Sequence, residues 1–482
     1  MTFKTLSTAI TASLLSLNSQ AATDVIESVT LPKGSPVYEY SLDNGLKIIV
    51  KPDHRAPVVL SQIWYRIGST YEPNGITGIS HMLEHMMFKG TKKLKPGQID
   101  EIVEDNGGQQ NAFTSYDYTA YYQYWGADNL NLSFEIESDR MRNLLLDQHL
   151  FDKEKQVVLE ERNMRTEDNP IGYAFERHMA AANLSNPRHH PIIGWRGDIE
   201  QYTVNDLNQW YQNWYAPNNA TLVVVGDVDP KEVKQKAESY FGNIQASKLP
   251  ETKKHPNQPA IGSRVVHVDR EKVEVPTLIL GFNTPSIKTV KDIKEAYALM
   301  VLDSILGGNA SSRLQTELVR NKEIASSINS EYEPFALDGT QLMIFALPNG
   351  SNTLDDVKTN ILKQIQTIQK NGIDKEELEK VKVNVLASKI YSMDSLTSQA
   401  FLLGSFASLG LSSDDAQNYL ESVLKVTPDE VQAVANKYLT DENMTVTYLK
   451  QKDIIKPSNV TNDKTKELKE IGPLTDTDDL QS

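Results

Sequence analysis

The stretch Asn219-Ala220-Thr221-Leu222-Val223 follows a predicted helix and has a counterpart 224 positions later, Asn443-Met444-Thr445-Val446. It closes the block 203–221, which parallels 427–445. Two further matches keep the same order: Pro57-Val58-Val59-Leu60 with Pro276-Thr277-Leu278-Ile279, at offset 219, and Phe151-Asp152-Lys153-Glu154 with Ile373-Asp374-Lys375-Glu376, at offset 222. Offsets that drift so little indicate two copies of one fold. The alternative, chance similarity between amphipathic helices, does not explain three matches in order.

Strands and helices alternate along the first copy. Strands are predicted at 37–51 (a hairpin that turns at Asp43-Asn44-Gly45), 58–67, 110–114, 119–125 and 220–225. Helices are predicted at 76–88, 96–106 and 204–214, and a long helical stretch at 129–164 has an expected break near Phe151-Asp152. The hairpin signals favour antiparallel pairing. We therefore predict the α+β class, with two homologous domains that each consist of a mostly antiparallel sheet covered by helices.

Composition suggests where these domains begin and end. The segment 247–263 carries Pro250, Pro256 and Pro259 among Lys and Gln, which is typical of a linker. The expected domains are then 37–246 and 264–452, and residues 456–482 are expected to form a polar tail. A chain of 482 residues suits two domains of about 200 residues each.

Charge and cysteine content exclude several classes of function. The formal net charge of −15 argues against nucleic-acid binding, because phosphate contacts need clustered Lys and Arg. The chain has no cysteine, so a disulfide framework, a thiolate zinc site and a cysteine nucleophile are excluded. Beyond the N-terminal region no segment approaches the ~20 apolar residues that span a membrane.

The N-terminus has the composition of a signal peptide. Lys4 is followed by an apolar stretch, 6–17, and then by Ser19-Gln20-Ala21-Ala22, whose small residues suit cleavage. We expect residues 1–22 to be a signal peptide and the protein to be periplasmic or secreted. A disordered or helical N-terminal extension is the alternative.

The segment Ser80-His81-Met82-Leu83-Glu84-His85 carries the candidate chemistry. On a helix, residues four apart lie on one face, so His81 and His85 can direct two imidazole nitrogens at one zinc ion. Glu84 lies on the same side, where it can hold a zinc-bound water and take its proton. The pattern is His-x-x-Glu-His, the inverted form of a common zinc-peptidase motif.

A catalytic zinc site needs a third protein ligand and an open position. The helical stretch downstream carries Glu154 and Glu161, which are seven residues apart and share a face, whereas Glu160 is rotated away. We predict Glu161 as the third ligand of one Zn²⁺ per chain. Glu154 is expected behind the ligands, where it orients a histidine or the ligand carboxylate.

The second copy lacks this constellation. At offset 222 the counterpart of Glu161 is Val383, and the matching helix reads Leu302-Asp303-Ser304-Ile305-Leu306. One copy with a polar cluster and one without is not what a purely structural role predicts. A three-position motif also arises by chance, and paired histidines are often surface residues. The helical context, the downstream carboxylates and the duplication favour metal catalysis.

With these residues in place, the chain resembles the pitrilysin (M16) family of peptidases over about 37–450, and within it the two-domain bacterial group similar to mitochondrial processing peptidase. In the family the third zinc ligand follows the second histidine by about 76 residues, and 76 residues after His85 is Glu161. Further segments resemble family signatures: Gly107-Gly108 with Asn111-Ala112-Phe113-Thr114-Ser115, Pro191 to Trp195, Trp214 to Asn219, and Gly307-Gly308 with Ser311-Ser312-Arg313-Leu314.

The resemblance implies an edge strand beside the zinc that pairs with the peptide substrate. Its expected residues are Asn111, Ala112, Phe113 and Thr114. An exposed strand edge offers unpaired N–H and C=O groups to an extended peptide. The alternative for Asn111 is a turn residue after the glycines.

One position departs from the family pattern. The second domain of complete enzymes supplies an Arg and, seven residues later, a Tyr that face the substrate. Arg320 fits the Arg, but the Tyr position is occupied by Ser327. The resemblance therefore implies a hetero- or homodimer with another M16 chain that supplies an Arg/Tyr pair.

Together these observations predict a zinc-dependent endopeptidase that hydrolyses unfolded peptides or protein segments by means of a zinc-activated water. The alternative is a non-catalytic or partner-dependent assembly or processing subunit of an M16 complex. A third possibility is a self-sufficient homodimer in which another residue replaces the missing Tyr.

Overall fold

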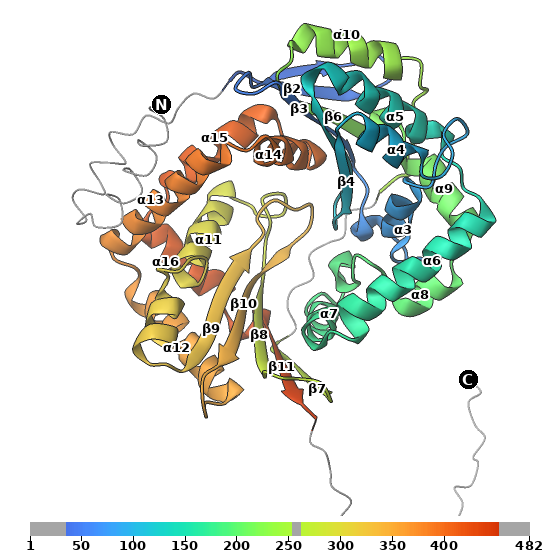
Figure 1. The fold of residues 1–482 in the computed structure, drawn as a ribbon. Coiled ribbons are helices and arrows are strands. Elements are labelled where there is room, and N and C mark those ends of the chain that lie inside the picture. The colour runs from blue at the N-terminus through green and yellow to red at the C-terminus, as the bar shows by residue number, and fades with distance from the viewer. Residues whose placement is uncertain (1–34, 253–261, 453–482) are drawn as a thin grey trace, which may run out of the picture.

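The computed structural model describes residues 35–252 and 262–452. The expected signal peptide at 1–22 and the tail at 456–482 lie outside the described residues, as does most of the expected linker. Two sheets form the frame (Figure 1). None of the helices in the described ranges is both long and apolar enough to cross a membrane.

The first sheet has six strands in the order β1-β2-β6-β3-β5-β4. These are β1 (Tyr38–Ser41), β2 (Lys47–Pro52), β3 (Val58–Tyr65), β4 (Gln109–Thr114), β5 (Thr119–Gly126) and β6 (Ala220–Gly226). Only the β2–β6 pair is parallel, and the other four pairs are antiparallel. Strand β4 lies at the edge, where only β5 pairs with it among the described strands.

The second sheet repeats this arrangement without the counterpart of β1. Its order is β7-β11-β8-β10-β9, and again only one pair, β7–β11, is parallel. The strands are β7 (Arg264–Arg270), β8 (Thr277–Thr284), β9 (Ala325–Tyr332), β10 (Thr340–Pro348) and β11 (Met444–Gln451). Strands β3 and β8 begin 219 positions apart and β6 and β11 begin 224 apart, which are the offsets of the sequence repeat. The predicted α+β duplication is confirmed.

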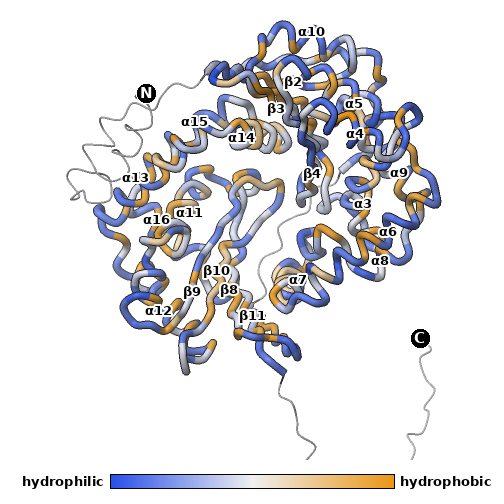
Figure 2. The backbone as a smooth tube through the Cα atoms, viewed as in Figure 1, coloured by the Kyte–Doolittle hydropathy of each residue, from blue (hydrophilic) through white to orange (hydrophobic). Residues whose placement is uncertain are grey.

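Helices of the first half are α3 (Ile79–Met86), α4 (Gln98–Asp105), α5 (Leu130–Asn143), α6 (Gln148–Arg162), α7 (Pro170–Ala182), α8 (Arg196–Gln201), α9 (Val204–Trp214) and α10 (Pro230–Phe241). Those of the second half are α11 (Ile293–Leu306), α12 (Leu354–Asn371), α13 (Lys375–Ser392), α14 (Leu396–Ser408), α15 (Ser413–Leu424) and α16 (Pro428–Tyr438). Hydropathy alternates along most of them, as the mixed colouring of Figure 2 shows, which is the pattern of helices with one buried face.

The expected break near Phe151-Asp152 is wrong. Helix α6 runs unbroken through these residues, and the interruption lies between α5 and α6. Asp147 caps the new helix by accepting hydrogen bonds from the backbone N–H groups of His149 and Leu150. Leu144, just before it, forms an isolated antiparallel bridge with Thr91, so the chain is extended there. The cap and the bridge, rather than a change in apolar periodicity, set this boundary.

The two halves exchange helices. Helix α14 of the second half packs on β3 and β6 of the first sheet, and α7 of the first half packs on β7, β8 and β11 of the second. Alternate side chains of the first sheet divide accordingly: Ile63 faces the helices of its own half, whereas Trp64 faces α14. At Gly404 the contact is so close that a Cβ atom would lie 2.0 Å from Trp64 Cε2. Each sheet is therefore completed by a helix from the other half.

Candidate metal centre

Helix α3 begins at a tightly built corner. Gly78 precedes it with a φ of 86°, and a Cβ atom there would lie 2.2 Å from the carbonyl oxygen of Ile193. The buried carboxylate of Glu72 accepts hydrogen bonds from the N–H groups of Gly78 (2.6 Å) and Ser80 (2.8 Å). A carboxylate at a helix N-terminus satisfies N–H groups that have no partner within the helix. The start of α3 is thus held by side-chain and backbone contacts.

Three candidate ligands meet between α3 and α6. One ligand atom each from His81, His85 and Glu161 lies within 4.8 Å of the others. Glu161 Oε2 is 3.2 Å from His85 Nε2 and 3.6 Å from His81 Nε2. This oxygen is buried and makes no hydrogen bond with any residue in the described ranges. Two imidazole nitrogens and one carboxylate oxygen form a donor set that zinc prefers, so the residues present fit this ion.

The charges of the cluster agree with this donor set. Burial and the neighbouring His85 lower the pKa of His81 to about 4, so its imidazole is neutral at neutral pH. Burial alone would raise the pKa of Glu161, but the adjacent histidines and Arg165 outweigh it and the net shift is downward. Glu161 is therefore ionised. Neutral imidazole and carboxylate are the forms in which these side chains bind metals.

A second group of residues supports the histidine. Glu154 Oε1 lies 2.9 Å from His85 Nδ1, and its other oxygen lies 2.8 Å from Lys89 Nζ. Glu161 is oriented in a similar way, because Arg165 Nη2 is 2.9 Å from its Oε1. A carboxylate on the outer ring nitrogen fixes the orientation of a ligand histidine. Lys89 and Arg165 were not predicted. Their spacing, four residues after His85 and Glu161, is the signal that could have found them.

Glu84 is bound to the edge strand. Thr114 Oγ1, at the end of β4, donates a 2.5 Å hydrogen bond to Glu84 Oε2. Burial raises the pKa of Glu84, and the bond from Thr114 acts in the opposite direction. The structure thus brings Thr114, expected to contact substrate, onto the carboxylate of the candidate base.

The other expected substrate residues of β4 divide between its faces. Asn111 is exposed, and its side-chain oxygen accepts from the backbone N–H of Ala112 at 2.8 Å. Phe113 points toward the second half, where its ring lies 5.4 Å from that of Trp64 and 5.6 Å from that of Phe401 on α14. Phe113 therefore belongs to an aromatic cluster between the halves as well as to the edge strand.

Arg320 lies on the second half, in the π-helical turn η6 (Gln315–Asn321). It is exposed, and its guanidinium donates to the carbonyl oxygen of Ala310. Within the described ranges it forms no ion pair with Glu84 or Glu161. Ser327, at the position expected for Tyr, is exposed on the edge strand β9.

Comparison with known proteins agrees with this fold and cluster. The family model described as Insulinase (Peptidase family M16) matches residues 47–194, and the Peptidase M16 inactive domain matches 201–385. The zinc protease PqqE of Helicobacter pylori is 33% identical over 428 residues, which cover 87% of this chain and 93% of that protein. The uncharacterized zinc protease YmxG of Bacillus subtilis is 29% identical over 367 residues, covering 75% of this chain and 86% of that one.

Solved structures extend the comparison. The crystal structure of a protease from Helicobacter pylori superposes with a TM-score of 0.82 at 31% identity, covering 86% of this chain and 99% of that one. The first half of the periplasmic protease PqqL from Escherichia coli has the same fold, with a TM-score of 0.72 at 23% identity, covering 87% of this chain and 93% of that one. The chain belongs to the M16 family of zinc proteases.

Proposed function

We propose that the chain is a zinc endopeptidase in which His81, His85 and Glu161 hold one Zn²⁺ and Glu84 is the general base. The observation that supports this most directly is the convergence of three ligand atoms within 4.8 Å beside a buried carboxylate. Zinc bound there would supply Lewis acidity that makes a water nucleophilic near neutral pH. Glu84 takes the proton of the attacking water at its carboxylate and passes it to the leaving amine.

The proposed substrate is an unfolded peptide or protein segment that pairs with the free edge of β4. Backbone pairing with Asn111, Ala112 and Phe113 would set the register of the scissile bond, with Thr114 marking the position of Glu84. Folded proteins offer few extended segments for such pairing, so unfolded chains are the expected substrates. We also propose a periplasmic or secreted location, and division of the chain into the homologous domains 37–246 and 264–452 by a linker at 247–263.

Hydrolysis of an unstructured peptide by the purified chain with added zinc tests the proposal. We expect stoichiometric zinc in the wild type and in Glu84→Gln, and loss of zinc in Glu161→Gln. Activity is expected to vanish in both variants. Full activity in Glu84→Gln would overturn the mechanism.

A second function is favoured by Ser327, which stands where a Tyr is expected. A partner-dependent or non-catalytic subunit would leave the Arg/Tyr pair to another M16 chain, in a hetero- or homodimer. Mass in solution, measured alone and with proteins recovered from the native source, discriminates the two. A zinc-loaded monomer that hydrolyses peptides alone contradicts the subunit hypothesis.

A further inference from the structure

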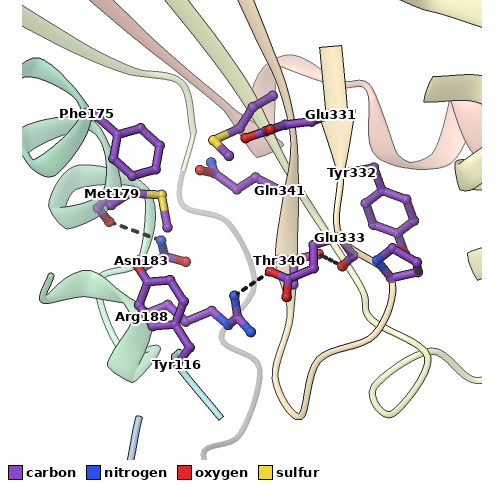
Figure 3. Close-up of a pocket in the computed structure, with 12 residues that line it drawn as sticks. Tyr116, Phe175, Met179, Asn183, Arg188, Glu331, Tyr332, Glu333, Thr340 and Gln341 are labelled. Atoms are coloured by element: carbon purple, nitrogen blue, oxygen red, sulfur yellow. Dashed lines mark hydrogen bonds and ion pairs between the residues drawn. The ribbon is translucent and has the colours of Figure 1, made fainter. Parts of the chain in front are cut away.

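A cavity of about 440 Å³ lies where the two halves meet (Figure 3). Helix α7 of the first half contributes Phe175 and Met179 to one wall. The opposite wall is one face of β9 and β10, where Glu331 and Met343 are directly opposed partners and Gln341 lies two residues along the same strand face. Figure 3 shows these side chains pointing into the space between the ribbons. The cavity therefore exists only because both halves are present.

The cavity carries an excess of negative charge. Its guanidinium, Arg188, is 3% exposed and already forms a 2.8 Å ion pair with the buried Asp117. Two further carboxylates, Glu331 and Glu333, line the same space. Glu333 lies 3.2 Å from Arg188, whereas the side chain of Glu331 makes no hydrogen bond or ion pair within the described ranges. One cation thus faces three anions, and Glu331 has no partner.

Two buried groups in the wall are also unsatisfied. Gln341 is 4% exposed; its side-chain nitrogen donates to Asn283 at 2.9 Å, but its Oε1 has no hydrogen-bond partner among the described residues. Arg188 Nε is likewise buried without a partner. Buried polar groups normally have partners, and those without one often meet a ligand or a water. A ligand with cationic donors and a carbonyl acceptor, such as a peptide with a basic side chain, would match both.

The cavity adjoins the candidate metal centre along the chain. Tyr116, which lines it, follows Thr114 by two residues, and Thr114 bonds to Glu84. Helix α7 follows the turn η3 (Asn163–Glu167), which continues directly from the helix of Glu161. A peptide paired with β4 and extended past Tyr116 would therefore run toward the seam. Each residue of an extended chain advances about 3.3 Å.

We propose that this cavity is a subsite for a lysine or arginine side chain of the peptide substrate. The aliphatic stem packs against Phe175, Met179 and Met343, and the charged end meets Glu331. Long basic side chains commonly bury their stem and direct the charge to a polar group. The inference rests on the proposed peptidase function and adds a selectivity that the second half supplies to a reaction carried out on the first.

The test compares peptides that differ only by Lys or norleucine at one position, scanned along both sides of the scissile bond, with the zinc-loaded full chain. We expect one position at which Lys raises kcat/KM roughly tenfold, through KM. In Glu331→Gln this preference is expected to disappear while the norleucine peptides are unaffected. Glu331→Lys is expected to reverse the preference toward Glu. The matched control is Glu274→Gln, an exposed carboxylate of the same half.

Two results would overturn the subsite: no position preferring Lys in the wild type, or an equal loss for basic and neutral peptides in Glu331→Gln. If the wild type hydrolyses no peptide, the proposed function fails separately. Binding of fluorescent Lys and norleucine peptides to the Glu84→Gln protein then decides the subsite alone. Equal affinities there would contradict it, and tighter binding of the Lys peptide that Glu331→Gln removes would support it.

Discussion

Thr114 and Glu84 are joined by a 2.5 Å hydrogen bond that links the free edge strand β4 to the helix of the candidate metal centre. The bond favours the ionised form of Glu84, whose pKa burial raises. In Thr114→Val we therefore expect the pKa of Glu84 to rise further, so that activity falls off at a higher pH on the acid side of the pH profile. We also expect kcat to fall about tenfold at neutral pH. Thr114→Ser, which keeps the hydroxyl, is the control, and an unchanged acid limb in the valine variant would contradict the assigned role.

Glu154 and Lys89 form a chain of contacts behind His85. Loss of such an outer contact typically weakens metal binding by about 10–100-fold. We expect Glu154→Gln to lower zinc affinity by that amount and Lys89→Met by less, as measured by competition with a chelator. Glu160→Gln is the control, because Glu160 is exposed on the same helix and bonds only to Asn163. Equal zinc affinity in the Glu154 and Glu160 variants would refute the supporting role.

Gly404 tests the contact between α14 and the first sheet. Alanine is favoured over glycine inside a helix, so intrinsic propensity alone predicts that Gly404→Ala is stabilising. The contact with Trp64 predicts the reverse, because the added Cβ atom would overlap the ring. We expect the variant to lose about 1–3 kcal/mol of unfolding free energy. Gly197→Ala on α8, where a Cβ atom meets nothing within 4 Å, is expected to be neutral or slightly stabilising.

Asp303 occupies the repeat position of His81. Burial raises its pKa to about 6, and Ser330 Oγ donates a 2.5 Å hydrogen bond to its Oδ1. A carboxyl group whose folded pKa exceeds its unfolded pKa of about 3.9 contributes stability at low pH that is lost as the pH rises through the folded value. We therefore expect Asp303→Asn, which does not ionise, to be more stable than the wild type at pH 8 by about 1–3 kcal/mol.

The difference in urea unfolding is expected to shrink toward pH 4, where the wild-type carboxyl is protonated. Asp269→Asn, at an exposed position on β7, is expected to show no such dependence. A difference that grows as the pH falls would show that the sign is wrong.

Much of the fold could be predicted because duplication leaves a double record of each element. The offsets of 219 and 224 recur as the starts of β3 and β8 and of β6 and β11. Within the second copy, Asp374 caps α13, whereas its sequence match Asp152 lies inside α6, whose cap is Asp147. The local match is therefore not matched by the helix boundary. Caps depend on single side chains and shift more readily than apolar periodicity does.

The exchange of α7 and α14 and the cavity between the halves could not be predicted. Both helices are amphipathic, and nothing in an apolar stripe states which sheet will cover it. Lys89, Arg165 and Arg188 were likewise missed, because their value lies in contacts made across the fold rather than in a motif. The clustering of His81, His85 and Glu161 was predictable, since helical spacing and the length of the intervening chain constrain them closely.

The exchanged helix α14 also has a consequence for how the chain matures during synthesis. The apolar surface around Trp64 and Leu60 stays uncovered until residues 396–408 have left the ribosome, more than 150 residues after β6 is complete. The first half then waits unfinished, and an isolated fragment ending at the linker would expose this face and tend to associate. Proteolytic competence would thus arise late, when nearly the whole polypeptide has been made, which delays the appearance of a protease until its translation is almost over.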